Sequence, residues 1–185
     1  MRKNPARNIR ARSSGFTLLE ILVVVVIIGI LVTFATLSIG NRALDDRMEM
    51  ESARLEQTLR LAAEEAETKG IELGFRYTSS GYGFYVTDKD GKWIPYADAG
   101  PLRPRELADP FYLELHVEGR IVAPAQDAQS SGDKAQKIEP QILLLSSGEM
   151  TASTLDLKAG HYAPYYHIDA DTLGTITRTR HDDAS

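Results

Sequence analysis

A short segment near the N terminus combines residue types suited to a proteolytic step and to a charge pairing. Ser14, Gly15 and Phe16 lie where a basic leader meets a long apolar run, and Glu20 follows inside that run. Cleavage after the small Gly15 residue would create a new amine on Phe16, close to Glu20 in the chain. Because opposite charges attract strongly where the dielectric is low, Glu20 of one subunit is suited to pair with the Phe16 amine of a neighbour.

The apolar run is long enough to cross a membrane. Residues 21–39 contain no charged side chain, and a helix needs about 20 apolar residues to span a bilayer. A cleavable secretory signal is disfavoured, because its apolar region usually has about 7 to 15 residues and Ser38-Ile39-Gly40 is a poor cleavage site. A carboxylate inside such a span costs about 2.5 to 3.5 kcal/mol unless it is partnered. Glu20 therefore requires a partner from outside the run.

The charges that flank the run predict its orientation and exclude several protein classes. The leader contains five basic residues and no acid, so the positive-inside rule places residues 1–15 in the cytoplasm. The formal net charge of the 185-residue chain is -5, which excludes a basic nucleic-acid-binding domain. The chain has no cysteine, so disulfides, thiolate metal sites and cysteine nucleophiles are also excluded.

Beyond the run, the pattern predicts a helix followed by strands. Apolar residues from Leu44 to Ala66 recur at helical spacing, and Gly70 provides a helix stop, so we expect a helix over residues 17–69. The apolar period then changes to two, which predicts antiparallel strands packed on the helix. Asp88-Lys89-Asp90-Gly91 predicts a hairpin turn between two of them. We expect strands at 71–78, 83–87, 92–94, 111–118, 120–123, 141–146, 153–157, 165–169 and 175–179.

Catalytic and ligand-binding roles find little support. Ser146-Ser147-Gly148-Glu149 offers a nucleophile that His161 or His167 and Asp169 could assist, but the segment lacks the G-x-S-x-G elbow. The two histidines lack a third ligand at helical or hairpin spacing, and the Asp88 turn lacks the later bidentate glutamate of a calcium loop. We therefore predict no catalytic residue, no metal site and no cofactor.

The segment Gly15-Phe16-Thr17-Leu18-Leu19-Glu20, with the apolar run after it, resembles the N-terminal signal of type IV pilins and type II secretion pseudopilins. In that superfamily a prepilin peptidase cuts after the glycine and methylates the new amine, and the glutamate guides subunit docking. The resemblance implies processing at Gly15 and Phe16 and an assembly role for Glu20. It also implies a pilin-like α+β fold, with a long N-terminal helix on an antiparallel β-sheet or β-sandwich.

More diffuse patches resemble the H-type minor pseudopilins of type II secretion, the GspH family. The patches are residues 139–151, 59–66, 81–84 and 93–95. The missing cysteines and Leu37, where major pilins commonly have proline, argue against a major pilin. His161 to Asp171 matches the calcium loop of major pseudopilins poorly, and Glu20 argues against the K-type tip subunit. A minor pilin of a type IV pilus is the main alternative, and a membrane-anchored periplasmic enzyme or binding domain is a weaker one.

The resemblance implies a non-enzymatic subunit that links the pseudopilus tip to the major-pseudopilin shaft for export of folded proteins across the outer membrane. Its expected partners are the major and minor tip pseudopilins, the prepilin peptidase and the Gram-negative inner membrane. The implied organisation is a cleaved leader at 1–15, a transmembrane helix at 16–39, an amphipathic continuation at 40–70, a periplasmic β domain at 71–179 with a mobile loop at 124–140, and a tail at 180–185.

Overall fold

The computed structural model describes residues 17–96, 100–126 and 138–182, without the side chains of residues 34–41. The chain divides into two compact units, Met1–Ala43 and Leu44–Ser185. The single α-helix of the described residues, α1, runs over Leu18–Lys69 and contributes to both units. The helix expected over residues 17–69 is thus confirmed.

The end of α1 follows from a glycine in the left-handed conformation. Gly70 has φ of 65°, which residues with a Cβ rarely adopt. The N–H of Ile71 donates to the carbonyl of Ala66 at 3.0 Å, and the N–H of Gly70 donates to the carbonyl of Glu67 at 3.3 Å. These two bonds form a Schellman motif, which satisfies the last carbonyls of a helix. The predicted stop at Gly70 is therefore confirmed together with its cause.

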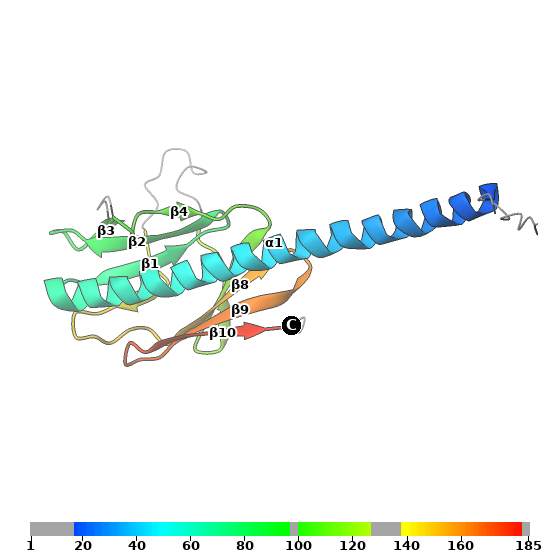
Figure 1. The fold of residues 1–185 in the computed structure, drawn as a ribbon. Helices are drawn as coiled ribbons and strands as arrows, with labels where there is room; N and C mark the ends of the chain where they lie inside the picture. The colour runs from blue at the N-terminus through cyan, green and yellow to red at the C-terminus, as the bar shows by residue number, and fades with distance from the viewer. Residues whose placement is uncertain (1–16, 97–99, 127–137, 183–185) are drawn as a thin grey trace, which may run out of the picture. The chain divides into compact units, whose positions relative to one another are not determined.

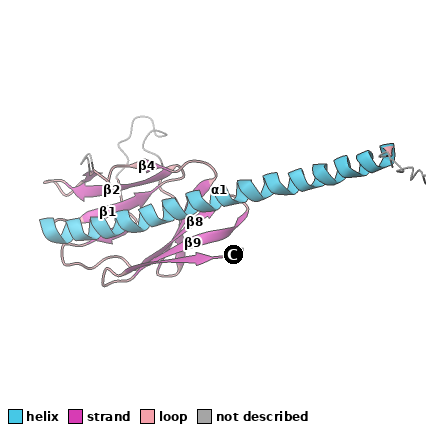
Figure 2. Ribbon diagram, in the orientation of Figure 1, coloured by secondary structure: helices cyan, strands magenta, loops and turns pink. Residues whose placement is uncertain are grey.

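The first antiparallel sheet contains the predicted hairpin. Its strands have the order β3-β2-β1-β7, and β4 also pairs with β2. Figure 2 labels β1, β2 and β4 of this sheet. Asp88 closes the hairpin between β2 and β3, since its Oδ1 accepts the N–H groups of Asp90 and Lys92 at 2.9 and 2.8 Å. The bounds are β1 Leu73–Tyr77, β2 Gly81–Thr87, β3 Trp93–Pro95, β4 Arg105–Glu106 and β7 Ile142–Leu144.

The second antiparallel sheet has the strand order β10-β9-β8-β5-β6. A two-residue turn joins β5 to β6, and both of its residues, Glu118 and Gly119, have positive φ, as a type I′ turn requires. β10 continues two residues into the expected tail at 180–185, because Arg180 and His181 pair with β9. The bounds are β5 Phe111–Val117, β6 Arg120–Val122, β8 Ser153–Ala159, β9 Tyr162–Ala170 and β10 Ile176–His181.

The second half of α1 and the two sheets share one hydrophobic core within the unit Leu44–Ser185. The predicted apolar face of the helix is buried, and α1 lies along the strands in Figure 1. Burying one large apolar side chain contributes about 1.5 to 3 kcal/mol, so this face alone is a substantial source of stability. The buried helix residues are Met48, Leu55, Leu59, Ala62 and Ala66, and they join residues such as Phe75, Phe84, Leu155 and Leu157 of the sheets.

Acidic side chains of α1 also pair with arginines of the strands. Arg105 Nε of β4 donates to Glu51 Oε2 at 3.0 Å, and Arg178 Nε of β10 donates to Glu56 Oε2 at 3.2 Å. All four side chains are less than a third exposed, so solvent screens these pairs less than it screens fully exposed ones. The polar residues of the helix thus attach it to an edge of each sheet.

Candidate functional site

The N-terminal candidate residues divide between the described and undescribed parts of the chain. Gly15 and Phe16 lie outside the described residues, whereas Glu20 lies in the first turn of α1. The N–H of Glu20 donates to Oγ1 of Thr17 at 3.2 Å. Thr17 is therefore the N-cap of the helix, and the Thr-x-x-Glu spacing is that of a capping box. This local relation was not predicted, although the spacing is a known helix-start signal.

The first half of α1 exposes an apolar surface. From Leu18 to Val32 its large apolar side chains are between 44% exposed, at Val24, and 86% exposed, at Leu18. Glu20 is the single charged residue in this segment. An apolar surface of this extent is typical of a region that contacts lipid or other proteins. Within the part of the chain that the structure describes, no helix is both long enough and apolar enough to cross a membrane.

The catalytic arrangement considered for Ser147 is not assembled by the described contacts. Ser147 Oγ lies 3.4 Å from Glu149 Oε2, within a turn whose Gly148 N–H donates to the Leu145 carbonyl. His167 and Asp169 lie in β9 of the second sheet, and each bonds to a residue of β8. Ser147 thus contacts Glu149, whereas His167 contacts Asp156, so their contacts do not form a catalytic pair. The hydrogen bond of Gly148 shows that this segment is a turn between strands.

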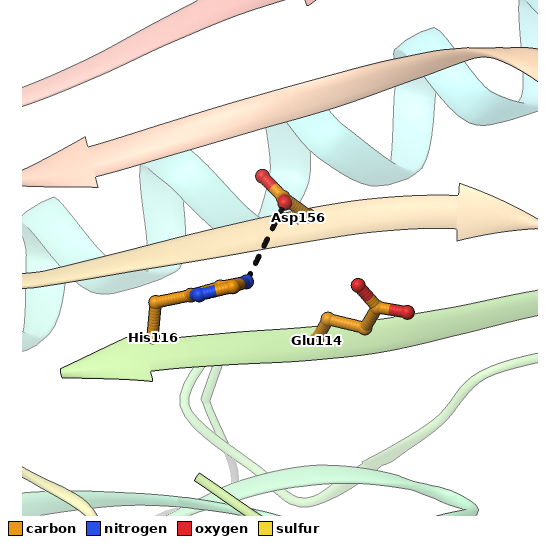
Figure 3. Close-up of side chains that lie close together, drawn as sticks. All are labelled: Glu114, His116 and Asp156. Carbon is orange, nitrogen blue, oxygen red and sulfur yellow. Dashed lines mark ion pairs between the residues drawn. The ribbon is translucent and has the colours of Figure 1, made fainter. Parts of the chain in front are cut away.

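A cluster of ionisable side chains lies on one face of the second sheet. Strand register places Glu114 of β5 opposite Asp156 of β8, and Asp156 opposite His167 of β9. His167 Nδ1 lies 2.8 Å from Asp156 Oδ1, and His116 Nε2 lies 3.9 Å from Asp156 Oδ2. Figure 3 shows His116 and Asp156 directed toward one another, with the Glu114 carboxylate beside them. Lys158 Nζ donates to Glu114 Oε2 at 2.8 Å.

The histidines considered and rejected as ligands from the sequence, His161 and His167, are not the pair formed by Glu114 and His116. His161 is exposed and lies outside this cluster, while His167 contacts Asp156. Glu114, His116 and Asp156 were not singled out, although one ligand atom from each lies within 4.8 Å of the others. The alternation of residues 111–118 was sufficient to place Glu114 and His116 on one face of a strand. It contained no information on the strand that supplies Asp156.

Comparison with known proteins identifies the family. Residues 10–36 match the prokaryotic N-terminal methylation motif. Protein H of the type II secretion system of Aeromonas hydrophila is 31% identical over 80% of this chain and 82% of its own length. The corresponding protein of Pseudomonas aeruginosa is 34% identical over 78% of this chain and 83% of its own length. The chain belongs to the type II secretion system protein H family.

Solved structures confirm the fold of this protein H family member. A crystal structure of the minor pseudopilin EpsH of Vibrio cholerae matches with a TM-score of 0.60 and 21% identity, over 72% of this chain and 96% of that one. A second EpsH structure matches with a TM-score of 0.57 and 20% identity, over 71% and 95%. The predicted pilin-like α+β fold and the H-type family are both confirmed. The relatives are named as secretion-system components rather than enzymes, and the methylation motif indicates a membrane-anchored envelope protein.

Proposed function

We propose that this protein is a minor pseudopilin subunit that links the tip complex to the major-pseudopilin shaft of the type II secretion pseudopilus. In this role it supports the export of folded proteins across the outer membrane. The observation that carries the proposal is the methylation motif at residues 10–36, joined to a helix that exposes apolar side chains and one acid. Such a surface is stable in lipid before assembly and against other apolar helices after it.

The proposed processing step is cleavage between Gly15 and Phe16 by a prepilin peptidase, followed by methylation of the new amine. Mass spectrometry of the protein from cells that contain the peptidase should find N-methylated Phe16 at the N terminus. Gly15→Val should block cleavage and leave membrane insertion intact. An intact Met1 terminus, or one at Asn41, in the wild-type protein would overturn the proposed processing.

The proposed topology is a single inner-membrane span over residues 16–39, with an amphipathic continuation at 40–70 and the β domain at 71–179 in the periplasm. It rests on the basic residues that precede the apolar run. The natural chain has no cysteine, so single cysteines report topology without background labelling. In intact spheroplasts, a membrane-impermeant maleimide should label Lys89→Cys, because residue 89 lies in the exposed turn between β2 and β3. It should not label Ser13→Cys in an unprocessed Gly15→Val protein, and the opposite pattern would refute the orientation.

The proposed assembly role of Glu20 is to neutralise the N-terminal amine of a neighbouring subunit. The Thr-x-x-Glu spacing of a capping box would give the Glu20 side chain a purely local role, so the test must separate that role from docking. Glu20→Gln keeps a residue that suits the capping box but removes the negative charge. Thr17→Ala removes the cap, at a cost of about 0.5 to 2 kcal/mol of helix stability, and leaves the charge.

A secretion assay and crosslinking between subunits in the same strains distinguish these roles. If the charge guides docking, Glu20→Gln and Glu20→Ala should both give processed, membrane-resident protein that enters the pseudopilus poorly. Thr17→Ala should then assemble better than either variant. Normal assembly and secretion with Glu20→Gln would mean that the carboxylate is not the docking group.

A further inference from the structure

Three side chains on the face of the second sheet converge as metal ligands do. One ligand atom from each of Glu114, His116 and Asp156 lies within 4.8 Å of the other two. Zinc bonds to nitrogen and oxygen of about 2.0 to 2.2 Å place neighbouring tetrahedral donors about 3.4 Å apart. His116 Nε2 and Asp156 Oδ2, at 3.9 Å, are already near that separation. We propose that these three residues bind one divalent transition-metal ion, with Zn²⁺ as the best fit, independently of the assembly role proposed above.

The backbone holds the three ligands in place without a metal. Glu114 and Asp156 are directly paired residues of β5 and β8, and His116 lies two residues further along β5 on the same face. Directly opposed Cβ atoms lie about 4.5 to 5.5 Å apart in an antiparallel pair. The pairing of β5 with β8 therefore holds the Glu114 and Asp156 side chains close enough to share an ion. Regular strands therefore preorganise the site.

His167 orients the central carboxylate. Its Nδ1 lies 2.8 Å from Oδ1 of Asp156, which leaves Oδ2 directed at His116. The His181 ring packs edge-on against His167 with a centroid distance of 5.5 Å, so the position of His167 is itself supported. Metal-binding carboxylates are commonly held by such an outer hydrogen bond. Asp156 is 8% exposed, so its carboxylate is shielded from most of the solvent.

The local charge also favours a cation. Two acidic side chains, Glu114 and Asp156, lie beside one lysine, Lys158. The Lys158 ammonium already occupies Glu114 Oε2 at 2.8 Å, so it competes with an ion for this carboxylate. A divalent ion would compensate the remaining charge more fully than water does. Lys158 is thus expected to limit the affinity of the site.

The ligand types select the class of ion. Imidazole nitrogen together with carboxylate oxygen suits zinc and similar transition metals, whereas calcium and magnesium favour sites made of oxygen alone. Three protein ligands leave one position of a tetrahedral ion open for water. We therefore expect zinc to bind and calcium and magnesium to bind far more weakly.

Isothermal titration of the full chain in detergent, without a polyhistidine tag, tests the proposal with ZnCl₂ as the probe. We expect one zinc ion per chain, reversed by a chelator, and little heat from CaCl₂ or MgCl₂. His116→Gln and Glu114→Gln should each weaken zinc binding at least about 10-fold. Loss of a residue that only hydrogen-bonds to a metal ligand already lowers metal affinity by about this factor. Lys158→Met should strengthen it several-fold, and His161→Gln is the matched control with an exposed histidine outside the cluster.

Circular dichroism of each variant shows whether it retains the fold. If a ligand variant unfolds, Lys158→Met decides the question, because it leaves every ligand in place and should still tighten binding. Unchanged affinity in folded His116→Gln would overturn the proposal. So would a loss in His161→Gln as large as that in His116→Gln, since His161 is not one of the three proposed ligands.

Discussion

Replacing Leu59 with alanine tests whether the second half of α1 belongs to the same folding unit as the sheets. Leu59 is 1% exposed and belongs to the core that joins the helix to both sheets. Truncating a buried leucine removes its transfer free energy and leaves a cavity, which together cost about 2 to 5 kcal/mol. Met50 lies on the same helix but is 63% exposed, so Met50→Ala should change stability by about 0.5 kcal/mol or less.

The expected loss is large compared with the stability of a domain. Natural domains unfold with a free energy of about 5 to 15 kcal/mol, so 3 kcal/mol is a considerable fraction. For a unit the size of Leu44–Ser185, 3 kcal/mol corresponds to a lowering of Tm by about 10 °C. The pairs of the helix with Arg105 and Arg178 contribute less, because these side chains still reach solvent and a surface ion pair is usually worth about 1 kcal/mol or less. Apolar packing should therefore dominate helix attachment.

Urea unfolding of a fragment that begins at Asn41, followed by far-ultraviolet circular dichroism, measures this effect. The wild-type fragment should unfold in one cooperative transition that includes helix and strand signals. Leu59→Ala should lower the midpoint and keep the slope, which indicates a change of stability rather than of the denatured state. A Leu59→Ala loss within about 1 kcal/mol of the Met50→Ala loss would refute the packing of this helix face in the core.

Two further predictions concern the sheets. A Cβ on Gly81 would lie 1.9 Å from the backbone oxygen of Arg105, so Gly81→Ala should open the β2 to β4 pairing and destabilise the fold by about 1 to 3 kcal/mol. Gly100→Ala, which meets open space, is the control, and equal urea midpoints for both variants would contradict the close approach. The backbone N–H of Thr175 donates to Asp171 and lowers the pKa of that carboxyl below its ordinary value of 3.8. The stabilisation that results is complete above pH 3.8 and is lost as the pH falls through the lowered pKa. The difference in unfolding free energy between wild type and Asp171→Ala should shrink between pH 6 and about pH 2, and a difference that grows would have the wrong sign.

The helix and most strands were predictable because their signals are local. The apolar spacing from Leu44 to Ala66 identified the buried face of α1, and Gly70 identified its end. Alternation identified β1 and β5 within a few residues of their observed bounds. The spacing of apolar residues along a sequence indicates which face of a helix or strand is buried.

Elements defined by their partners were not predictable in the same way. β4 is two residues long, Arg105–Glu106, and exists because it pairs with Gly81 and Tyr82 of β2. Two residues cannot show a period, and the glycine that admits the close approach is distant in the chain. The N-cap Thr17 is different, because its spacing to Glu20 was visible in the sequence and was overlooked. Processing at Gly15 remains a prediction.

The cluster around Asp156 depends on the register between β5, β8 and β9, which cannot be predicted from the sequence pattern. Alternation alone places Glu114 and His116 on one face of β5, yet the third ligand comes from β8 and its hydrogen-bond partner from β9. A slip of one residue between β5 and β8 would turn Asp156 to the opposite face and disperse the ligands. The buried face of β8, which includes Leu155 and Leu157, forbids that slip because it would expose both side chains to water. The same apolar packing that stabilises the domain therefore assembles the proposed metal site.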